Sequence, residues 1–335
     1  MSCKTAVLGA TGLVGREIVN LLEEREFPVS DLYLYASENS AGEKMSFFGE
    51  DITIKALKPD NVENCDIYLS SMPGEVSQQI IPEIQEKNSG VIIDNSSSFR
   101  MDRDVPLVVP EVNGELLDEN EDLIANPNCS TIQLVMVLKP LLDEFGLKRV
   151  LVSTYQSASG SGAEAVSALK KESRARLQNG DCKAEYYDNP IAFNLLPAID
   201  YFHEDGFSNE EIKMRRESRK ILAEEDIEIN CTCVRVPVEY GHAESVYLEL
   251  EEKTQAEMVS DLLDQAVGVK VLDEPEAGVY PQPLDTEKTD DVLVGRIRND
   301  RDRSRGIHLY IAANNIRKGA ALNAVQIAEK INSGK

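Results

Sequence analysis

A cysteine near the middle of the chain has the surroundings expected of a nucleophilic thiol. Cys129 follows the turn pair Asn126-Pro127 and precedes an apolar run, Thr131 to Leu138, that predicts a helix. Unpaired N–H groups and the positive dipole end at a helix N-terminus lower the pKa of a thiol and can cradle an oxyanion. A buried cysteine that caps a helix fits the same stretch. Local sequence alone leaves both interpretations of Cys129 open.

Two further side chains could take part in acyl or phosphate chemistry. His242 follows Gly241 in a predicted turn between strands, where its near-neutral pKa would suit a general acid or base. Arg100 follows three serines, residues 96–98, at the carboxyl end of a strand predicted over residues 91–95. That edge of an open α/β sheet binds ligands, and three hydroxyl groups with one guanidinium suit a phosphate. A solvated loop histidine and a surface ion pair of the arginine are the alternatives.

The start of the chain has the order of elements that binds a dinucleotide. A strand predicted over residues 4–8 is followed by a glycine-rich loop and by a helix predicted over residues 16–24. Gly9 permits a tight turn, Gly12 lets the backbone approach the phosphates, and Gly15 allows close packing of the helix on the strand. The spacing G-x-x-G-x-x-G indicates an extended variant of this phosphate loop. A βα turn that binds nothing is the alternative.

The turn after the second predicted strand gives a mixed signal about the ribose of the cofactor. That strand covers residues 32–36 and ends in residues 37–42. Residues at this place contact the adenosine ribose in dinucleotide-binding folds. Ser37 and Ser40 would suit a 2′-phosphate, whereas Glu38 would suit a free 2′-hydroxyl and repel a phosphate.

Small and polar residues end two more predicted strands. The strand predicted from residue 67 ends in Ser71 and other small residues before Gly74, as a loop near the nicotinamide would. Gln156 ends the strand predicted over residues 149–156 and could orient a substrate carboxylate or carbonyl. The alternative is a surface residue at the end of the strand. Residues 157–162 then form a loop of small residues before another predicted helix.

The rest of the second half alternates strands with helices. Ser208 and Glu211 have capping-box spacing and predict a helix that begins there. Within it, Glu210 and Lys213 lie three residues apart, which usually marks a solvated ion pair. Cys231 and Cys233 share one face of a predicted strand, where core packing is expected. Further strands are predicted over residues 230–237, 245–250, 290–298 and 307–313, and a final helix over residues 320–331. Residues 177–194 are polar and irregular, and this excursion would suit an oligomer contact.

Composition bounds the class of protein. The 335 residues, 42% hydrophobic and 28% charged, have the length of about two globular domains. A net charge of −24 argues against nucleic acid or an anionic membrane as a partner. No apolar run approaches the roughly 20 residues of a membrane span, and the start leaves no room for a signal peptide. Six scattered cysteines and three histidines show no zinc pattern, so we expect a reduced, cytoplasmic protein without a bound metal.

Together these features resemble the aspartate-β-semialdehyde dehydrogenase family over essentially the whole chain. Eight stretches carry the likeness by their order and spacing: residues 9–15, 96–100, 108–113, 126–131, 154–156, 210–213, 235–237 with 241–242, and 314–329. The resemblance implies an α/β fold with an N-terminal Rossmann-type NADP-binding domain, residues 1–129 and 315–335. A C-terminal α+β catalytic and dimerisation domain of the glyceraldehyde-3-phosphate-dehydrogenase-like kind would cover residues 130–314. It also implies a homodimer, with a tetramer as the alternative.

By this resemblance, the enzyme reduces L-aspartyl-4-phosphate to L-aspartate-4-semialdehyde and inorganic phosphate with NADPH, in the pathway to lysine, threonine, methionine and isoleucine. Cys129 would be the nucleophile and His242 the general acid/base. The implied substrate-binding residues are Arg100 and Lys213 for the phosphate, Arg235 for the α-carboxylate, Glu210 for the α-amino group and Gln156 for the acyl intermediate. The implied cofactor-binding residues are Gly9, Thr11, Gly12, Leu13, Val14, Ser37, Ser40, Ser71, Ser159, Gly160 and Asn315.

The residue types fit this chemistry independently of the family. A thiolate displaces phosphate from an acyl phosphate, and the resulting thioester accepts a hydride and then collapses to the aldehyde. Sulfur suits this role because it leaves readily yet keeps the carbonyl electrophilic. A substrate that carries both phosphate and carboxylate also explains two arginines and a lysine in so acidic a chain.

One position departs from the family pattern. Many members carry an arginine in the turn after the second strand, where it meets the 2′-phosphate of NADP. This chain has Asn39 there, with Glu38 beside it. We expect NADP because Ser37 and Ser40 persist, and the use of NAD as a secondary cofactor stays open.

Two rival interpretations remain at the level of sequence. N-acetyl-γ-glutamyl-phosphate reductase shares the thioester chemistry, but its acylated amine would not call for a carboxylate such as Glu210. A nucleotide-binding scaffold without catalytic activity would need neither Cys129 nor His242, and it would not need Arg100 or Arg235.

Overall fold

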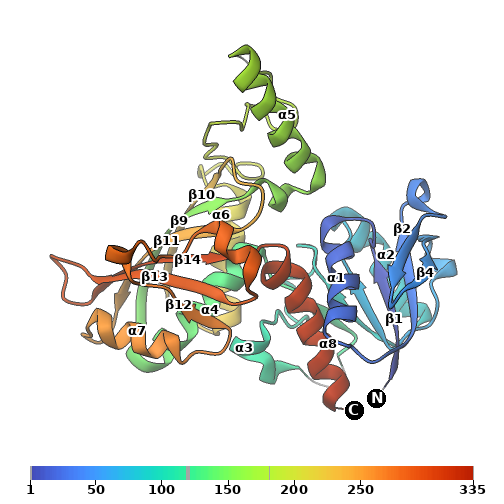
Figure 1. Ribbon diagram of the computed structural model, residues 1–335. Coiled ribbons are helices and arrows are strands. Elements are labelled where there is room, and N and C mark those ends of the chain that lie inside the picture. The colour runs from blue at the N-terminus through green and yellow to red at the C-terminus, as the bar shows by residue number, and fades with distance from the viewer. Residues whose placement is uncertain (1, 118–120, 181, 335) are drawn as a thin grey trace. The chain divides into compact units, whose positions relative to one another are not determined.

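The computed structural model describes residues 2–117, 121–180 and 182–334, and the chain forms two compact units (Figure 1). Unit 1 contains Met1–Asn128 and Ala320–Lys335, and unit 2 contains Cys129–Gly319. Cys129 and residues 315–319 thus belong to unit 2, whereas the sequence analysis assigned them to the first domain. The physical reason is local, because Cys129 begins a helix of unit 2 and the Gly241 N–H of the same unit donates to Asn315.

Unit 1 is built on a six-stranded parallel sheet with the order β5-β2-β1-β6-β7-β8. Its strands are β1 (Cys3–Leu8), β2 (Val29–Ala36), β5 (Lys55–Ala56), β6 (Ile67–Ser70), β7 (Val91–Asp94) and β8 (Leu123–Ala125). Its other elements are α1 (Leu13–Glu24), α2 (Gly74–Lys87), α3 (Pro110–Asn113), α8 (Leu322–Gly334) and the hairpin β3 (Lys44–Phe47) and β4 (Glu50–Thr53).

Helices cover both faces of the unit 1 sheet because its strands are apolar on both faces. Successive side chains of a strand point to opposite faces. Val7 of β1 accordingly packs in one core with residues of α1 and α8, and its neighbours Ala6 and Leu8 pack in another with residues of α2. This arrangement is the Rossmann-type architecture that the sequence predicts.

The last helix packs on the first helix of unit 1. Its predicted apolar positions, Leu322, Val325, Ile327 and Ala328, are all buried. Arg25 at the end of α1 donates from Nε to Glu329 at 2.7 Å. The α-helical hydrogen bonding begins two residues later than predicted, because a π-helical segment, Arg317–Ala321, precedes it.

Unit 2 is built on a six-stranded mixed sheet with the order β10-β9-β11-β14-β13-β12. Its strands are β9 (Leu147–Gln156), β10 (Glu228–Arg235), β11 (His242–Leu250), β12 (Val269–Val271), β13 (Val292–Asn299) and β14 (Gly306–Ala313). Its helices are α4 (Cys129–Phe145), α5 (Ala163–Asn179), α6 (Asn209–Leu222) and α7 (Ala256–Asp264). Helix α5 projects away from the sheet (Figure 1).

The two faces of the unit 2 sheet differ. Helix α4 packs on β9, β11, β13 and β14, and it also contacts α6 and α7. On the opposite face Leu151 and Tyr155 of β9, Tyr247 of β11 and Tyr310 of β14 remain partly or largely exposed. The sheet therefore has one face in its own core and one apolar face that is only partly buried.

Three details revise or bear out the predicted elements. Helix α1 begins at Leu13 rather than at residue 16, which brings its first turn into the glycine loop. The capping box of Ser208 and Glu211 is present at the start of α6, as predicted. Strand β11 begins at His242, so this histidine is not in a turn. None of the described helices combines the length and apolar character that crossing a bilayer requires.

Candidate active site

The glycine loop of unit 1 lies at the point where the sheet order reverses. The chain runs from β1 to β2 on one side and later places β6 on the other side of β1. Ligands of open α/β sheets bind beyond the carboxyl ends of strands at such a switch point. The predicted loop after β1 and Ser71 after β6 both lie at this edge.

Close approach makes two of the loop glycines necessary. Gly9 has φ +86°, and a Cβ there would lie 3.0 Å from the carbonyl oxygen of Ser71. A Cβ on Gly15 would lie 2.2 Å from the carbonyl oxygen of Gly9, which no side chain could tolerate. The Ser71 hydroxyl donates to the Gly9 carbonyl at 3.1 Å and ties the two loops together.

The remaining predicted loop residues lie at the N-terminus of α1. Gly12 is the N-cap residue, Leu13 and Val14 begin the helix, and Thr11 precedes the cap. The first N–H groups of a helix have no partner within it, and the helix dipole favours an anion there. This turn therefore has backbone donors suited to a pyrophosphate.

The turn after β2 carries more positive charge than its own sequence suggests. Ser37 precedes a 3₁₀ turn, Glu38–Ser40. Lys58 lies 2.8 Å from Glu38, and both side chains are mostly exposed. Lys58 could not be linked to this turn from the sequence because it lies far along the chain, yet it offsets the acidic charge that would repel a 2′-phosphate.

Arg100 is a buried side chain of unit 1. It is 7% exposed. Its Nε donates to the carbonyl of Asn126 at 2.9 Å, and its Nη2 donates to the carbonyl of Asn95 at 2.7 Å. The loops after β7 and β8 therefore fix the guanidinium at the carboxyl edge of the sheet.

In unit 2, Cys129 is the first residue of α4, as predicted, and it is partly exposed. Burial raises the pKa of the Cys65 thiol to about 12 and also raises those of Cys231 and Cys233, whose predicted core packing is confirmed. Gly319 lies against Cys129, since a Cβ on it would approach the Cys129 Cβ to 2.9 Å. A side chain at 319 would therefore collide with Cys129.

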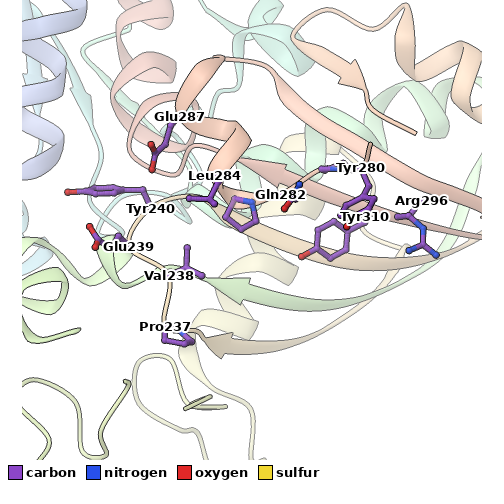
Figure 2. A pocket seen from close by; sticks show the side chains of 12 residues that line it. Pro237, Val238, Glu239, Tyr240, Tyr280, Gln282, Leu284, Glu287, Arg296 and Tyr310 are labelled. Carbon is purple, nitrogen blue, oxygen red and sulfur yellow. The ribbon is translucent and has the colours of Figure 1, made fainter. Parts of the chain in front are cut away.

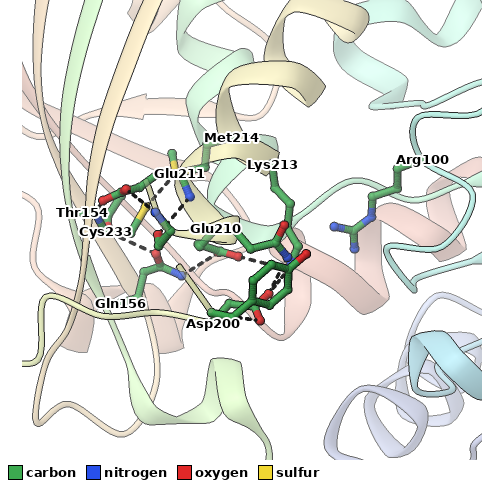
Figure 3. Close-up of polar contacts among 12 residues, drawn as sticks. Arg100, Thr154, Gln156, Asp200, Glu210, Glu211, Lys213, Met214 and Cys233 are labelled. Atoms are coloured by element: carbon green, nitrogen blue, oxygen red, sulfur yellow. Dashed lines mark hydrogen bonds and ion pairs between the residues drawn. The ribbon is translucent and has the colours of Figure 1, made fainter. Parts of the chain in front are cut away.

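Gln156, Glu210 and Lys213 form a polar cluster (Figure 3). Gln156 Nε2 donates to Glu210 at 3.0 Å, and Lys213 Nζ lies 3.6 Å from Glu210. Gln156 is 1% and Glu210 is 5% exposed, which rules out the alternative of a surface glutamine and the expectation of a solvated ion pair. Asp200 accepts a hydrogen bond from Lys213 at 2.8 Å, a partner that sequence analysis did not find.

Arg235 and His242 end β10 and begin β11, respectively, and both are buried. Arg235 donates from Nη1 to the Ser157 carbonyl at 2.7 Å, while its Nε has no partner among the described residues. A Cβ on Gly160 would lie 2.8 Å from that Nη1 and 3.0 Å from His242 Nε2. Gly160, predicted as a cofactor residue, therefore leaves open the space that both side chains face.

His242 is fully buried, contrary to the alternative of a solvated loop histidine. Burial, and next the charge of Arg235, hold the pKa of His242 well below its ordinary value. The backbone nitrogen and the hydroxyl of Ser157 each lie 3.0 Å from its Nδ1. Its Nε2 has no partner among the described residues and is the atom free to act on a ligand.

The segment after β14 connects the surroundings of His242 and of Cys129 within unit 2. Ser159 and Asn315, two predicted cofactor residues, hydrogen-bond each other at 3.0 Å, and the Ser157 hydroxyl donates to Asn315 at 3.1 Å. Four residues further on, Gly319 lies against Cys129. One short segment thus contacts both Ser157, which lies against His242, and Cys129.

A separate cavity of about 800 Å³ contains none of the predicted site residues (Figure 2). It is lined by Pro237, Val238, Glu239, Tyr240, Tyr280, Pro281, Gln282, Pro283, Leu284, Glu287, Arg296 and Tyr310. Tyr310 also belongs to the partly exposed face of the unit 2 sheet. The cavity is therefore continuous with that face.

Two family models match the chain. The model described as semialdehyde dehydrogenase, NAD binding domain, matches residues 4–120, and the model described as semialdehyde dehydrogenase, dimerisation domain, matches residues 138–318. The two matches correspond to the two units and together cover most of the chain.

Full-length relatives agree with these domains. The aspartate-semialdehyde dehydrogenase of Aquifex aeolicus (strain VF5) is 50% identical over 333 residues, 98% of each chain. The crystal structure of aspartate semialdehyde dehydrogenase II from Vibrio cholerae, complexed with ASA, is 43% identical with a TM-score of 0.92 and 99% of both chains covered. The structure of aspartate semialdehyde dehydrogenase with NADP from Candida albicans is 27% identical with a TM-score of 0.77, again over 99% of both chains.

Proposed function

Because this chain belongs to the aspartate-semialdehyde dehydrogenase family, we propose that it reversibly converts L-aspartyl-4-phosphate to L-aspartate-4-semialdehyde and inorganic phosphate. The protein is an oxidoreductase with a nicotinamide dinucleotide as cofactor, in biosynthesis of lysine, threonine, methionine and isoleucine. One observation carries the residue assignments. Gln156, Glu210 and Arg235 end or begin elements far apart in sequence, yet all are buried and polar around one part of unit 2.

We assign Cys129 the role of nucleophile. Its sulfur attacks the acyl carbon, the bond from that carbon to the phosphate oxygen breaks, and a thioester forms. Its place at the N-terminus of α4 favours the thiolate and offers backbone donors to the oxyanion of the tetrahedral adduct. Its partial exposure supports this assignment over the buried cysteines.

We assign His242 the role of general acid/base at Nε2. The ring takes the thiol proton as sulfur attacks and passes it to the departing phosphate. The bound nicotinamide supplies the hydride that reduces the thioester. The resulting oxyanion then collapses with cleavage of the carbon–sulfur bond, which releases the aldehyde and regenerates the thiolate. A low pKa suits this shuttle because the neutral ring is the resting form.

The charged residues divide according to the groups of the substrate. Arg235, whose Nε has no partner among the described residues, can bind the α-carboxylate. Glu210 can hold the α-ammonium group while Gln156 positions the acyl carbon. Arg100 and Lys213 would bind the phosphate, with Asp200 holding Lys213 until an anion arrives. The buried carboxylate of Glu210 favours a free amine over an acylated one and so opposes the N-acetylglutamyl alternative.

We propose NADP as the preferred cofactor and NAD as a secondary one. Gly9, Gly12 and the first turn of α1, residues Thr11 to Val14, would bind the pyrophosphate, and Ser71 would border the nicotinamide side. Ser37 and Ser40, with Lys58 nearby, would hold the 2′-phosphate. Ser159, Gly160 and Asn315 would complete the nicotinamide contacts. The similar Candida albicans enzyme, whose crystal structure was determined with NADP, supports this choice.

We further propose a homodimer formed through the partly exposed face of the unit 2 sheet. Leu151, Tyr155 and Tyr310 on that face, and the adjoining cavity of Figure 2, offer apolar area to a second copy. Light scattering should give twice the chain mass, and Leu151→Asp should reduce it to one. A mass of four chains would favour the tetramer. Six free thiols fit a reducing, cytoplasmic setting.

The function is tested by phosphate-dependent reduction of NADP with aspartate semialdehyde. Wild-type protein should be active, Cys129→Ala inactive, and Cys182→Ala, as a matched control, fully active. N-acetylglutamate semialdehyde should not serve as substrate. No activity in the wild type, or full activity in Cys129→Ala, would overturn the proposal.

A further inference from the structure

Two different groups of Ser157 contact one ring nitrogen of His242, Nδ1. Nδ1 lies 3.0 Å from the backbone nitrogen of Ser157 and 3.0 Å from the hydroxyl oxygen of the same residue. Both histidine and serine are fully buried, so no solvent replaces either contact. A single residue thus faces Nδ1 with two polar groups of unlike character.

These two groups match the two proton states of Nδ1. A backbone N–H can only donate, so it can pair with Nδ1 only when that nitrogen carries no proton. A serine hydroxyl can accept, so it can pair with Nδ1 when the nitrogen is protonated. An unpaired buried donor would carry a large desolvation penalty. Ser157 therefore gives Nδ1 a partner in both states, although its own N–H is paired with the ring only when Nδ1 carries no proton.

Asn315 sets the direction of the Ser157 hydroxyl. The N–H of Gly241 donates to the Asn315 side chain at 2.9 Å, which identifies the accepting atom as Oδ1. The Ser157 hydroxyl can donate to this same oxygen at 3.1 Å. When its proton points to Asn315, the hydroxyl presents a lone pair to Nδ1. Ser159 completes the network by accepting from Asn315 Nδ2 at 3.0 Å.

We propose that Ser157, oriented by Asn315, is a positioning residue that lets Nε2 of His242 both accept and donate a proton. When Nε2 carries the only ring proton, Nδ1 accepts from the Ser157 N–H. When the ring holds its proton on Nδ1 or holds two, Nδ1 donates to the Ser157 hydroxyl. Nδ1 therefore keeps a hydrogen-bond partner whichever proton state Nε2 takes.

The Ser157 hydroxyl counteracts the effect of burial and of the Arg235 charge on protonation of the His242 ring. Burial and the charged group that acts on His242, Arg235 on β10, both disfavour the imidazolium. The hydroxyl of Ser157 acts in the opposite direction because it stabilises the proton on Nδ1. Removing that hydroxyl should leave a ring that holds a proton on Nε2 but takes up a second one with difficulty. This inference rests on the proposed role of His242 in the dehydrogenase reaction.

The test compares Ser157→Ala, which keeps the N–H, with Ser157→Thr, which keeps both groups. Ser161→Ala in the same loop is the matched control. We expect kcat of Ser157→Ala to fall about tenfold to a hundredfold, with the acid limb of its pH profile moved to lower pH. The KM for aspartate semialdehyde should change little. Ser157→Thr should recover part of kcat, and Ser161→Ala should match the wild type.

A spectroscopic measurement keeps the test independent of activity. The chain has three histidines, at 203, 242 and 308, so ¹⁵N-histidine NMR resolves His242 by comparison with His242→Asn. Wild-type protein should show partial protonation of both ring nitrogens, and Ser157→Ala only the Nε2–H form. An unchanged spectrum and an unchanged pH profile in Ser157→Ala would overturn the positioning role of Ser157. An inactive wild type would instead refute the proposed function, and the spectrum alone would then test the role of Ser157.

Discussion

The two ligand-binding regions of this chain are built in opposite ways. In unit 1 the proposed nucleotide site is made of backbone, with Gly9 and Gly15 in close contact and the first N–H groups of α1 as donors. In unit 2 the proposed catalytic site is made of side chains, the partly exposed Cys129 of α4 and mostly buried residues of α6 and three strands. The first depends on one continuous stretch of sequence, whereas the second depends on tertiary packing.

The regions also treat charge differently. Glu38 and Lys58, near the proposed ribose site, are mostly exposed and screened by solvent. Glu210, Arg235 and His242 are buried, where each charge or proton has a large effect on its neighbours. Substitutions in unit 2 should therefore act on rate and stability, and those in unit 1 on cofactor affinity.

Glu244 of β11 should give the largest effect, on stability. Burial raises the pKa of this carboxyl from 4.5 to about 8, and the neighbouring Gln133 side chain offsets only part of that rise. Below pH 4.5 both folded and unfolded states hold the proton. As pH rises toward 8, the unfolded state releases the proton and the folded state keeps it. The free energy of unfolding of the wild type therefore falls over this range.

Glu244→Gln should therefore stabilise the protein at pH 7 by roughly 3 kcal/mol, at about 1.4 kcal/mol per pKa unit. Urea denaturation at pH 5 and pH 8 measures this difference. The difference in free energy of unfolding between Glu244→Gln and the wild type should be larger at pH 8 than at pH 5. Equal stability of the two proteins at pH 8 would show that the Glu244 carboxyl is not held neutral.

Gly160→Ala tests the contrast between the regions directly. Its Cβ would lie 2.8 Å from Arg235 Nη1 and 3.0 Å from His242 Nε2, so both must shift. We expect kcat to fall about tenfold, because the required shifts are smaller than the displacement of about 1 Å that costs about a hundredfold in a catalytic site. Gly12→Ala in unit 1, whose Cβ would meet only the Gly9 carbonyl at 3.6 Å, should change the KM for NADP and not kcat. A lower kcat in Gly12→Ala with an unchanged kcat in Gly160→Ala would contradict this difference between the two units.

Asn39→Arg should have the smallest effect, because an exposed charge contributes only about 0.2–1 kcal/mol. The added guanidinium should tighten NADP binding by up to about fivefold, and Lys58→Ala should weaken it by a similar factor. The KM for NADP and for NAD, measured side by side, report this preference. An unchanged or weaker NADP KM in Asn39→Arg would contradict the placement of the 2′-phosphate.

The features that local rules determine could be predicted from the sequence. The strand, glycine loop and helix at the start follow from spacing, and the helix that begins at Cys129 follows from a turn and an apolar run. Burial of His242 and Glu210 could not be predicted, because a lone histidine after glycine and an i,i+3 charge pair are usually solvated. Tertiary packing, and not local pattern, places these charges in the interior.

Partners distant in sequence were missed for the same reason. Lys58 meets Glu38, and Asp200 meets Lys213, only because the fold brings separate loops together. Ser157 lies in a loop of small residues, a composition that does not indicate a role for any one of them. Only its short distance to His242 Nδ1 shows that it contacts the catalytic ring. Gly319 likewise reveals its role only through its contact with Cys129.

The central claim is that Cys129 carries the acyl group during the reaction. Intact-protein mass spectrometry after mixing with aspartate semialdehyde and NADP, without phosphate, tests it most directly. The thioester should accumulate as one added aspartyl group, located on Cys129 by peptide mapping and released by phosphate. An active enzyme that forms no such adduct, or an adduct on another residue, would contradict the account.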